Sequence, residues 1–341
     1  MLYLAIEMFF MLVLIVAAAE IFTNALEHLG HRFGLSEGVT GSLFAAVGTA
    51  LPEALIPVLA IFAGTDNKQV NEEIGVGAIL GAPLMLATLA CFIMAISVIR
   101  QRGITGFISP EPSGFRRDLN YFLIAYGLAA LAMFVPHENI IARSGLSITL
   151  VGLYFIYILH TFKASRMLVD EGHGTEAERA MFLARTGLPM GLPLMVIQVL
   201  IGLALLIVGA HGFIQGVEGI SEVIGVSALI LSLLVIPVAT ELPEKVNSII
   251  WVRRRRDTLA FGNLTGAMVF QGSLLPALGI MLTPWLPTSE VIPCLAITIM
   301  AAIWLRVNHF PNNGIRILSI MVCGLLYISY VGLALSGWEP Q

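Results

Sequence analysis

The chain has 341 residues, of which 57% are hydrophobic and only 12% are charged, and its mean hydropathy is +0.90. Soluble domains have about 25% charged residues, so this composition excludes an ordinary soluble protein and indicates one whose main solvent is lipid. The formal net charge of −4 says little about sidedness, which in a membrane protein depends on where the positive charges lie.

Ten stretches are apolar and long enough to cross a bilayer as helices, since a spanning helix needs about 20 mostly apolar residues. In chain order they are residues 3–26, 39–63, 74–99, 119–135, 147–162, 188–215, 224–252, 258–283, 288–305 and 315–336. No Lys or Arg precedes the first stretch, and it is longer than the apolar region of a signal peptide, so we expect it to stay in the mature protein. The sequence therefore predicts an all-α integral membrane protein.

Basic residues are concentrated in alternate connections between these spans. Fifteen of the 18 Lys and Arg residues follow spans 1, 3, 5, 7 and 9: Arg32, Arg100, Arg102, Arg116, Arg117, Lys163, Arg166, Arg179, Arg185, Arg253, Arg254, Arg255, Arg256, Arg306 and Arg316. The other connections hold Lys68 and Arg143, and Lys245 lies within span 7. Because cytoplasmic connections carry the excess of positive charge, we expect a multi-pass protein of the cell inner (plasma) membrane with both termini outside the cytoplasm.

An internal repeat relates the two halves of the chain. Residues 24–53 recur without gaps as residues 215–244, so that Leu51-Pro52-Glu53 matches Leu242-Pro243-Glu244. Five spans separate the copies, and because five is odd the second copy enters the membrane from the opposite side. We therefore predict a first five-helix repeat (1–162), a cytoplasmic linker (163–187) and a second, inverted five-helix repeat (188–341). Such repeats place a binding site near the bilayer midplane.

Carboxylates lie in the middle of spans 2 and 7, where each costs about 2.5 to 3.5 kcal/mol on insertion scales. Thr49 and Glu53 are four residues apart and share one helix face, as do Thr240 and Glu244. Glu241 adds a further carboxylate to span 7. Each of the two spans thus has a short polar stripe that ends at a carboxylate.

Prolines precede the two repeated glutamates directly. Pro52 and Pro243 should kink their helices and free the carbonyls four residues earlier, at Gly48 and Ala239. Carbonyls, carboxylates and hydroxyls together make an all-oxygen site of the kind that calcium and sodium prefer. A proline kink with a local Lys–Glu pair is the structural alternative for span 7, but the same arrangement at the centres of two inverted copies favours a cation site.

Spans 3 and 8 carry glycines four residues apart, which let helix backbones approach closely in a bilayer. Their members are Gly77 and Gly81 in span 3 and Gly262 and Gly266 in span 8. We expect these glycines to pack against the kinked helices. The polar groups of span 8 that could reach an ion are Asn263, Thr265 and Gln271.

Lys245 has two possible orientations. If it points into the cavity, its ammonium would neutralise Glu241 or replace a bound cation during part of the cycle; if it points away, it snorkels to the membrane surface. A glutamate among other carboxylates in an apolar surround can also take up a proton, so Glu241 is either a proton acceptor or a third cation ligand.

These residues resemble the calcium/cation antiporter superfamily, which includes sodium/calcium exchangers. Its two repeats carry a pattern close to GTSLPE in one helix and GNxxGSN in the next; residues 48–53 read GTALPE, 239–244 ATELPE, 77–83 GAILGAP and 262–268 GNLTGAM. The resemblance implies a sodium/calcium exchanger-like fold of ten helices. It also implies Glu53 and Glu244 as the ion-binding, metal-ligating carboxylates, Thr49 and Thr240 as oxygen ligands, and sliding of spans 1 and 6.

Several ligand positions of that pattern differ here. Ala50 and Glu241 replace the serines that follow the threonines, and Ala82 and Ala267 replace the serines of the glycine motif. The last ligand of the third and eighth helices corresponds to Leu86 and Gln271. The departures remove hydroxyl ligands, chiefly from the first repeat, and bear on the choice of ion rather than on the fold.

The sequence predicts a cation antiporter that exchanges calcium or another cation for sodium or protons by alternating access. The expected partners are inorganic cations and membrane lipid, with no nucleic acid, no obligate protein partner and no cofactor besides the transported cation. The alternative is a transport-deficient relic that acts as an ion-binding or scaffolding protein. An intramembrane enzyme is disfavoured because the chain has neither HExxH nor clustered aspartates. Cys91, Cys294 and Cys323 fall within spans, where we expect them to pack as small apolar residues.

Overall fold

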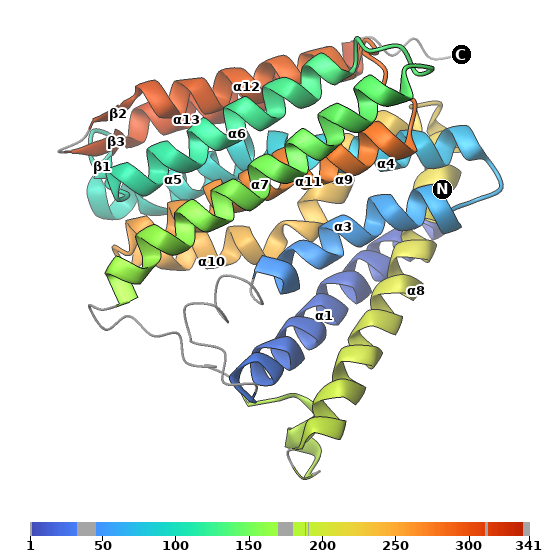
Figure 1. The fold of residues 1–341 in the computed structure, drawn as a ribbon, viewed down its shortest axis with the longest axis horizontal. Coiled ribbons are helices and arrows are strands. Elements are labelled where there is room, and N and C mark those ends of the chain that lie inside the picture. The colour runs from blue at the N-terminus through green and yellow to red at the C-terminus, as the bar shows by residue number, and fades with distance from the viewer. Residues whose placement is uncertain are drawn as a thin grey trace.

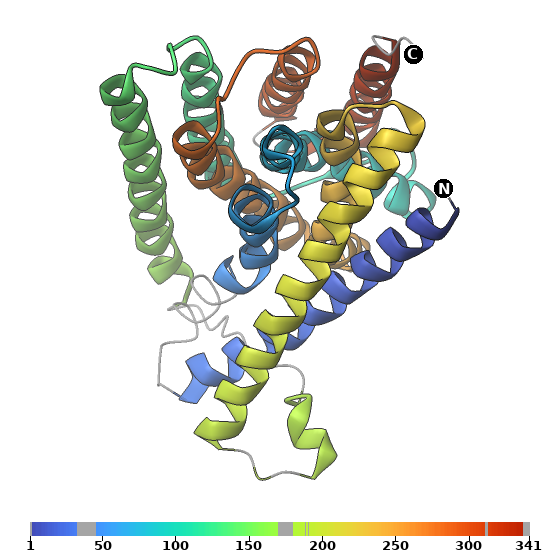
Figure 2. The ribbon, with the colours of Figure 1, turned by 90° about the vertical axis from the view of Figure 1, so that its right-hand side faces the viewer.

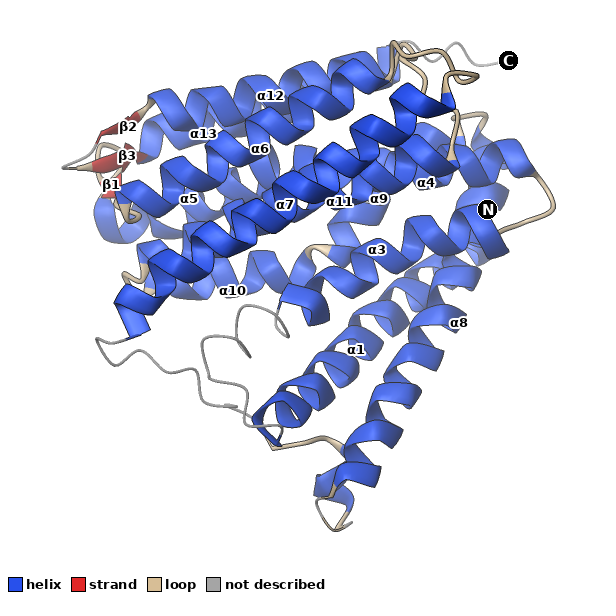
Figure 3. Ribbon diagram, viewed as in Figure 1, coloured by secondary structure: helices blue, strands red, loops and turns tan. Residues whose placement is uncertain are grey.

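The computed structural model describes residues 2–32, 46–169, 180–187, 189, 191–310 and 313–336. Most of these residues are helical (Figure 3). Six of the described helical segments are long and apolar enough to cross a bilayer, and two shorter apolar helices accompany them. The structure therefore confirms the predicted all-α membrane fold.

Within the described residues, helices lie in all ten predicted spans, and the start of the first helix and the end of the last one lie at the same end of the bundle (Figure 1). The helix of the fifth span continues past residue 162 to Val169. The helical elements in chain order are α1 (Leu2–Arg32), α3 (Ala46–Ala63), α4 (Lys68–Met85), the π-helical segment η2 (Leu86–Ala90), α5 (Cys91–Arg102), α6 (Pro112–Ala132), α7 (Ile140–Val169), the short 3-10 helix η3 (Leu183–Thr186), α8 (Leu192–Ile224), α9 (Ala228–Thr240), α10 (Leu242–Arg253), α11 (Asp257–Leu282), α12 (Val291–Val307) and α13 (Ile317–Ser336).

The long helices α1 and α8 pack along each other and extend away from the other helices (Figures 1 and 2). Glycines seven residues apart on α8 face α1. A Cβ on Gly202 would lie 2.8 Å from Phe22 Cβ, and one on Gly209 would lie 2.9 Å from Ile15 Cγ1. Small residues at such contacts let two helix backbones approach closely in lipid. α1 and α8 therefore contact each other more extensively than they contact the other helices.

Helices α4 and α9 join the two halves of the chain. A Cβ on Gly77 would lie 2.9 Å from Leu229 O, and one on Gly81 would lie 2.7 Å from Pro237 Cγ. The span 3 glycines thus lie directly against the seventh span. Among the described residues, by contrast, no atom lies within 4 Å of a Cβ on Gly262, and only Tyr157 Oη, at 3.6 Å, does so for Gly266. The close packing expected of all four glycines is seen for α4 and not for α11 in this part of the chain.

A small antiparallel sheet links the halves at the end opposite the termini. Its strands are β1 (Phe107–Ile108), β2 (His309–Phe310) and β3 (Gly314–Arg316), with β3 in the centre (Figure 1). β1 follows α5 in the first half, whereas β2 and β3 connect α12 to α13 in the second. The sequence did not predict this sheet.

An ion pair beside the sheet joins α5 to α11. Arg102 Nη1 and Nη2 lie 2.7 Å from the two carboxylate oxygens of Asp257, and both side chains are largely buried. Arg102 also donates to Val252 O and Phe107 O, and the backbone amide of Ser109 donates to Asp257. A two-pronged Arg–carboxylate pair of this kind fixes geometry as well as charge. The ion pair and the sheet therefore join the two halves of the chain at the end of the bundle opposite the termini. This end, which carries most of the Lys and Arg residues, is called the basic end.

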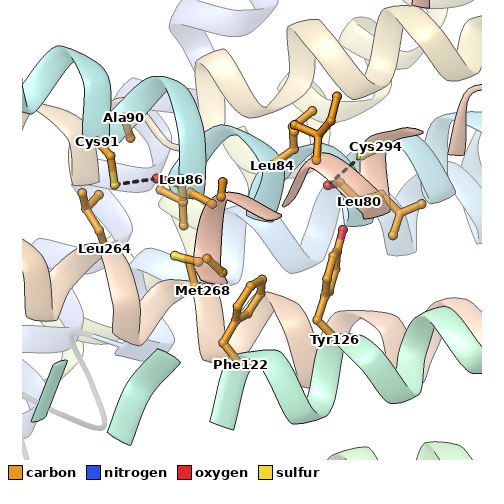
Figure 4. Close-up of a cluster of buried hydrophobic side chains, with 14 of the residues drawn as sticks. Leu80, Leu84, Leu86, Ala90, Cys91, Phe122, Tyr126, Leu264, Met268 and Cys294 are labelled. Atoms are coloured by element: carbon orange, nitrogen blue, oxygen red, sulfur yellow. Dashed lines mark hydrogen bonds between the residues drawn. The ribbon is translucent and has the colours of Figure 1, made fainter. Parts of the chain in front are cut away.

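The interior around α4 and η2 is apolar where these segments face α6, α11 and α12 (Figure 4). Leu86, in η2, is fully buried, and Cys91 Sγ donates to its carbonyl at 3.3 Å. Cys294 Sγ lies 3.6 Å from Leu80 O. All three cysteines are free and buried, as predicted.

Candidate cation-binding site

The seventh span is broken at Glu241, which lies between the end of α9 and the start of α10. Its backbone has φ −85° and ψ 4°, outside the α-helical region. Two prolines explain the break, because Pro237 lies within α9 and Pro243 has no N–H to donate to the carbonyl four residues earlier. The backbone amide of Glu241 still donates to Pro237 O at 3.2 Å. The break turns a charged side chain inward at the middle of the span.

Glu241 and Gln271 meet at this break. Both side chains are completely buried, and Gln271 Nε2, on α11, donates to Glu241 Oε1 at 2.5 Å. A hydrogen bond to an ionised carboxylate is stronger than one between neutral groups, and a buried carboxylate needs such donors. The structure thus brings together two of the predicted site residues, from the seventh and eighth spans.

Lys245 points into the protein and not toward the membrane surface. The residue is 7% exposed, and its Nζ lies 3.1 Å from Pro237 O, 3.2 Å from Val238 O and 2.9 Å from Met85 Sδ. Met85 ends α4 at the start of the π-helical segment, so the ammonium bridges the two halves of the chain. Of the two orientations open from the sequence, the structure shows the inward one.

Asn263 and Thr240 make other contacts. Asn263 Nδ2 donates to Ser248 Oγ at 3.1 Å, and Ser248 Oγ donates to Ala260 O at 3.1 Å, so these groups link α10 to α11. Asn263 precedes Gln271 by eight residues, which is about 12 Å along a helix. Thr240 is buried, and its hydroxyl donates to Ile236 O at 3.2 Å, one turn earlier. The structure does not bring Asn263 to the Glu241–Gln271 pair.

The remaining predicted ligands lie outside the residues whose side chains are described. They are Thr49, Glu53 and Glu244, together with the kink prolines Pro52 and Pro243 and the carbonyl candidates Gly48 and Ala239. Their convergence on one pocket stays a prediction. Among the side chains that the structure does describe, no group of three or more His, Cys, Asp and Glu residues could hold a metal ion.

A hollow rich in acidic and polar groups lies at the end of the bundle that carries the termini. It has a volume of about 780 Å³ and lies between the α3–α4 connection and the last turns of α8. Its lining includes the carboxylates of Asp66, Glu218 and Glu222 and the imidazole of His211. Thr65 Oγ1 donates to Glu218 Oε1 at 3.0 Å, so this connection is tied to α8. Carboxylates that line such a hollow attract cations.

The fold and this break define a class of membrane protein: a helical bundle of two inverted halves with charged groups buried where the halves meet. The profile of the family described as "Sodium/calcium exchanger protein" matches residues 3–163 and 194–336, in one segment for each half. The chain therefore belongs to the sodium/calcium exchanger family, which confirms the resemblance inferred from the sequence.

Individual relatives are distant. The chain is 24% identical over 276 residues to the inner membrane protein YrbG of Escherichia coli, covering 80% of this chain and 78% of that protein. It is 23% identical over 274 residues to the putative antiporter CaxA of Alkalimonas amylolytica, covering 79% and 77%. Among solved structures, the H+/Ca2+ exchanger CAX has a TM-score of 0.72 at 18% identity, covering 96% of this chain and 81% of that one. The sodium-calcium exchanger NCX_Mj has a TM-score of 0.57 at 20% identity, covering 97% and 98%. These structural likenesses show the shared fold.

Sequence reasoning missed three contributors to the site. Met85, in span 3, was not among the predicted site residues, yet its sulfur contacts the Lys245 ammonium. The carbonyls of Pro237 and Val238 accept from Lys245, whereas the sequence had pointed to Ala239. Pro237, six residues before Pro243, was the available signal, because two prolines in one span weaken its backbone hydrogen bonding at more than one turn.

Proposed function

We propose that this protein is a cation antiporter of the cell inner membrane that moves calcium or another cation against sodium or protons by alternating access. Glu53 and Glu244 are the principal ligands, and Glu241 is a third ligand or proton acceptor. The observation that carries the proposal is the fully buried Glu241 carboxylate at the break of the seventh span, held by Gln271 from the eighth. Charged groups at this depth are costly and are usually kept for function.

The arrangement of helices supports alternating access. α1 packs mainly on α8, while the ion pair and sheet at the basic end hold the other helices of both halves together. The contact between α1 and α8 is more extensive than the contacts of either helix with the rest of the bundle, so the pair can move against the other helices as one body. The acidic hollow beside α8 would gather cations at the end of the bundle that carries the termini.

Names of relatives agree with cation exchange but not on the ions. CaxA is described as a putative antiporter, CAX as an H+/Ca2+ exchanger and NCX_Mj as a sodium-calcium exchanger. Leu86 is buried among apolar groups where the family pattern has an oxygen ligand. That replacement supports an ion site built mainly from the second half, and it also keeps a transport-deficient ion-binding relic as the second candidate.

Reconstitution tests the proposal. Proteoliposomes are loaded with NaCl or at acid pH, and tracer uptake of calcium, sodium, potassium, manganese and magnesium is measured with and without the opposing gradient. We expect gradient-driven uptake of at least one of these cations, falling to the level of empty liposomes in Glu53→Gln and Glu244→Gln.

Glu138→Gln is the matched control, because Glu138 is exposed in the α6–α7 connection and should leave uptake unchanged. Unchanged flux in both Glu53→Gln and Glu244→Gln would reject their assignment as ligands. No flux of any tested cation, together with cation-dependent thermal stabilisation, would favour the relic instead.

A further inference from the structure

The Lys245 ammonium has the surroundings of a bound cation. It lies at the break of the seventh span, largely buried, and contacts two backbone carbonyls and a thioether. Carbonyl oxygens at a helix break are the groups that membrane transporters use to hold sodium. Here the positive charge at such a position is part of the chain.

Compared with the first repeat, the second repeat has this positive charge together with an additional negative one. In the alignment of residues 24–53 with 215–244, Glu241 matches Ala50, and the next residue pair beyond that alignment matches Lys245 with Ala54. The second repeat thus has one extra carboxylate and one extra ammonium, four residues apart and one turn from each other on the span. Pro237, whose carbonyl accepts a hydrogen bond from the ammonium, matches Ala46, so the proline within α9 is also particular to this repeat.

We propose that the Lys245 ammonium is a tethered cation that permanently fills one ion position in the second half of the site. This inference rests on the proposed function. With Glu53, Glu241 and Glu244 ionised, the site carries three negative charges, and the ammonium reduces the balance to two. That balance suits one divalent cation, or two monovalent ones, per cycle. The consequence is an exchange that takes one monovalent ion fewer per cycle than the same carboxylates would otherwise take.

Charge complementation tests this inference on the purified full chain in detergent. Thermal stability is titrated with NaCl or CaCl2, with choline chloride holding the ionic strength constant, for the wild type, Lys245→Met, Glu241→Gln and the double variant Glu241→Gln/Lys245→Met. Stabilisation grows with the number of ions bound by the folded state, so Lys245→Met should steepen the sodium dependence by about one ion. Glu241→Gln should weaken the calcium dependence, and the double variant should restore it, because only the single variant leaves the ammonium without its added negative charge.

Lys68→Met is the matched control, since Lys68 is exposed at the start of α4 and forms an ion pair with Glu72. It should leave both titrations unchanged. The inference is overturned if Lys245→Met keeps the wild-type sodium slope, or if the double variant binds calcium no better than Glu241→Gln; the second comparison decides even if Lys245→Met alone does not fold. If no cation stabilises the wild type and no cation is transported by it in proteoliposomes, the proposed function itself is rejected.

Discussion

At the scale of single residues, the buried Glu241 carboxylate depends on a donor from another span. Gln271 is the last-ligand position of the eighth span in the family pattern, and it reaches Glu241 rather than solvent. Where the family pattern has serine, this chain has the larger Glu241, and at the last-ligand position that faces it the chain has Gln271, whose side chain is longer than that of asparagine. The two substitutions are explained together by one hydrogen bond.

We predict that Gln271→Leu destabilises the protein by about 1.5 to 3 kcal/mol, because it removes a hydrogen bond from a buried charged group. The measurement is the shift of the thermal unfolding midpoint in detergent. The matched control is Thr298→Val, which removes a buried hydroxyl that donates to the uncharged Cys294 O, and it should cost less. Equal losses in the two variants would contradict the charged character of the Glu241–Gln271 bond.

At this scale, the sequence predicted where the seventh span is interrupted but not the contacts made there. The threonine–proline–glutamate pattern in span 7 identified a kinked, carboxylate-bearing helix, and the structure has a break there. The role of Met85 could not be predicted, because an apolar residue becomes a cation contact only through the fold that brings it to Lys245. The separation of Asn263 from Gln271 was predictable from their eight-residue spacing, which places them two turns apart.

At the scale of elements, the contact between α1 and α8 rests on glycines. Gly209→Val should destabilise the protein by about 1 to 3 kcal/mol, since the added side chain would meet Ile15 on α1 and force the helices apart. Thermal unfolding in detergent measures the effect. Gly332→Val on α13 is the matched control, because no described atom lies within 4 Å of its Cβ position. Equal unfolding midpoints for the two variants would exclude a close α1–α8 contact.

The start of α6 gives a pH-dependent prediction. Burial raises the pKa of Glu111, but its hydrogen bonds from the Gly114 and Ser113 amides and the charge of Arg117 outweigh burial, so the pKa is lowered from its ordinary 4.5. A carboxylate with a lowered pKa in the folded state contributes stability that is complete above its unfolded pKa and is lost as the pH falls through the folded value. The carboxylate also suits the helix N-terminus.

We therefore expect Glu111→Gln to lower the unfolding midpoint at pH 7, with the difference from the wild type shrinking as the pH falls below about 4.5. Thermal unfolding across a pH series measures this. Glu138→Gln, in an exposed connection, should show no such trend. A difference that stays constant down to pH 3 would show that the ionised cap contributes nothing.

Long apolar spans were predictable because each one must satisfy its backbone hydrogen bonds as a helix in lipid. The sheet was not, since strands of two and three residues are too short to show an alternating pattern. The π-helical segment η2 was also unpredicted; Pro83 lies just before it and removes one backbone donor from the preceding turn.

At the scale of the whole molecule, the two ends of the bundle differ in how they use positive charge. Both basic residues predicted for the end with the termini are engaged locally: Arg143 donates to the carbonyls of Ile280, Thr283 and Pro284 at the end of α11, and Lys68 pairs with Glu72. The excess at the opposite end is larger and includes the exposed run 253–256. The structure thus gives a physical reason for each exception to the charge bias.

The predicted orientation can be tested with single introduced cysteines, because the native ones are buried. Thr105 lies in an exposed turn at the basic end and Glu138 in an exposed turn at the other. In intact cells, a membrane-impermeant maleimide should label Glu138→Cys and not Thr105→Cys, and both should react after permeabilisation. The reverse pattern would show that the termini face the cytoplasm.

The unequal halves have an energetic consequence. Two identical inverted repeats would give end states that are images of each other, with the same free energy whichever side is open. Glu241 and Lys245 have only alanines at the matching positions of the first repeat, so exchanging the halves does not reproduce the same molecule. Symmetry then no longer requires the two end states to have the same free energy. We expect one preferred resting side, and unequal initial rates of exchange when the same ion gradients are imposed in opposite directions.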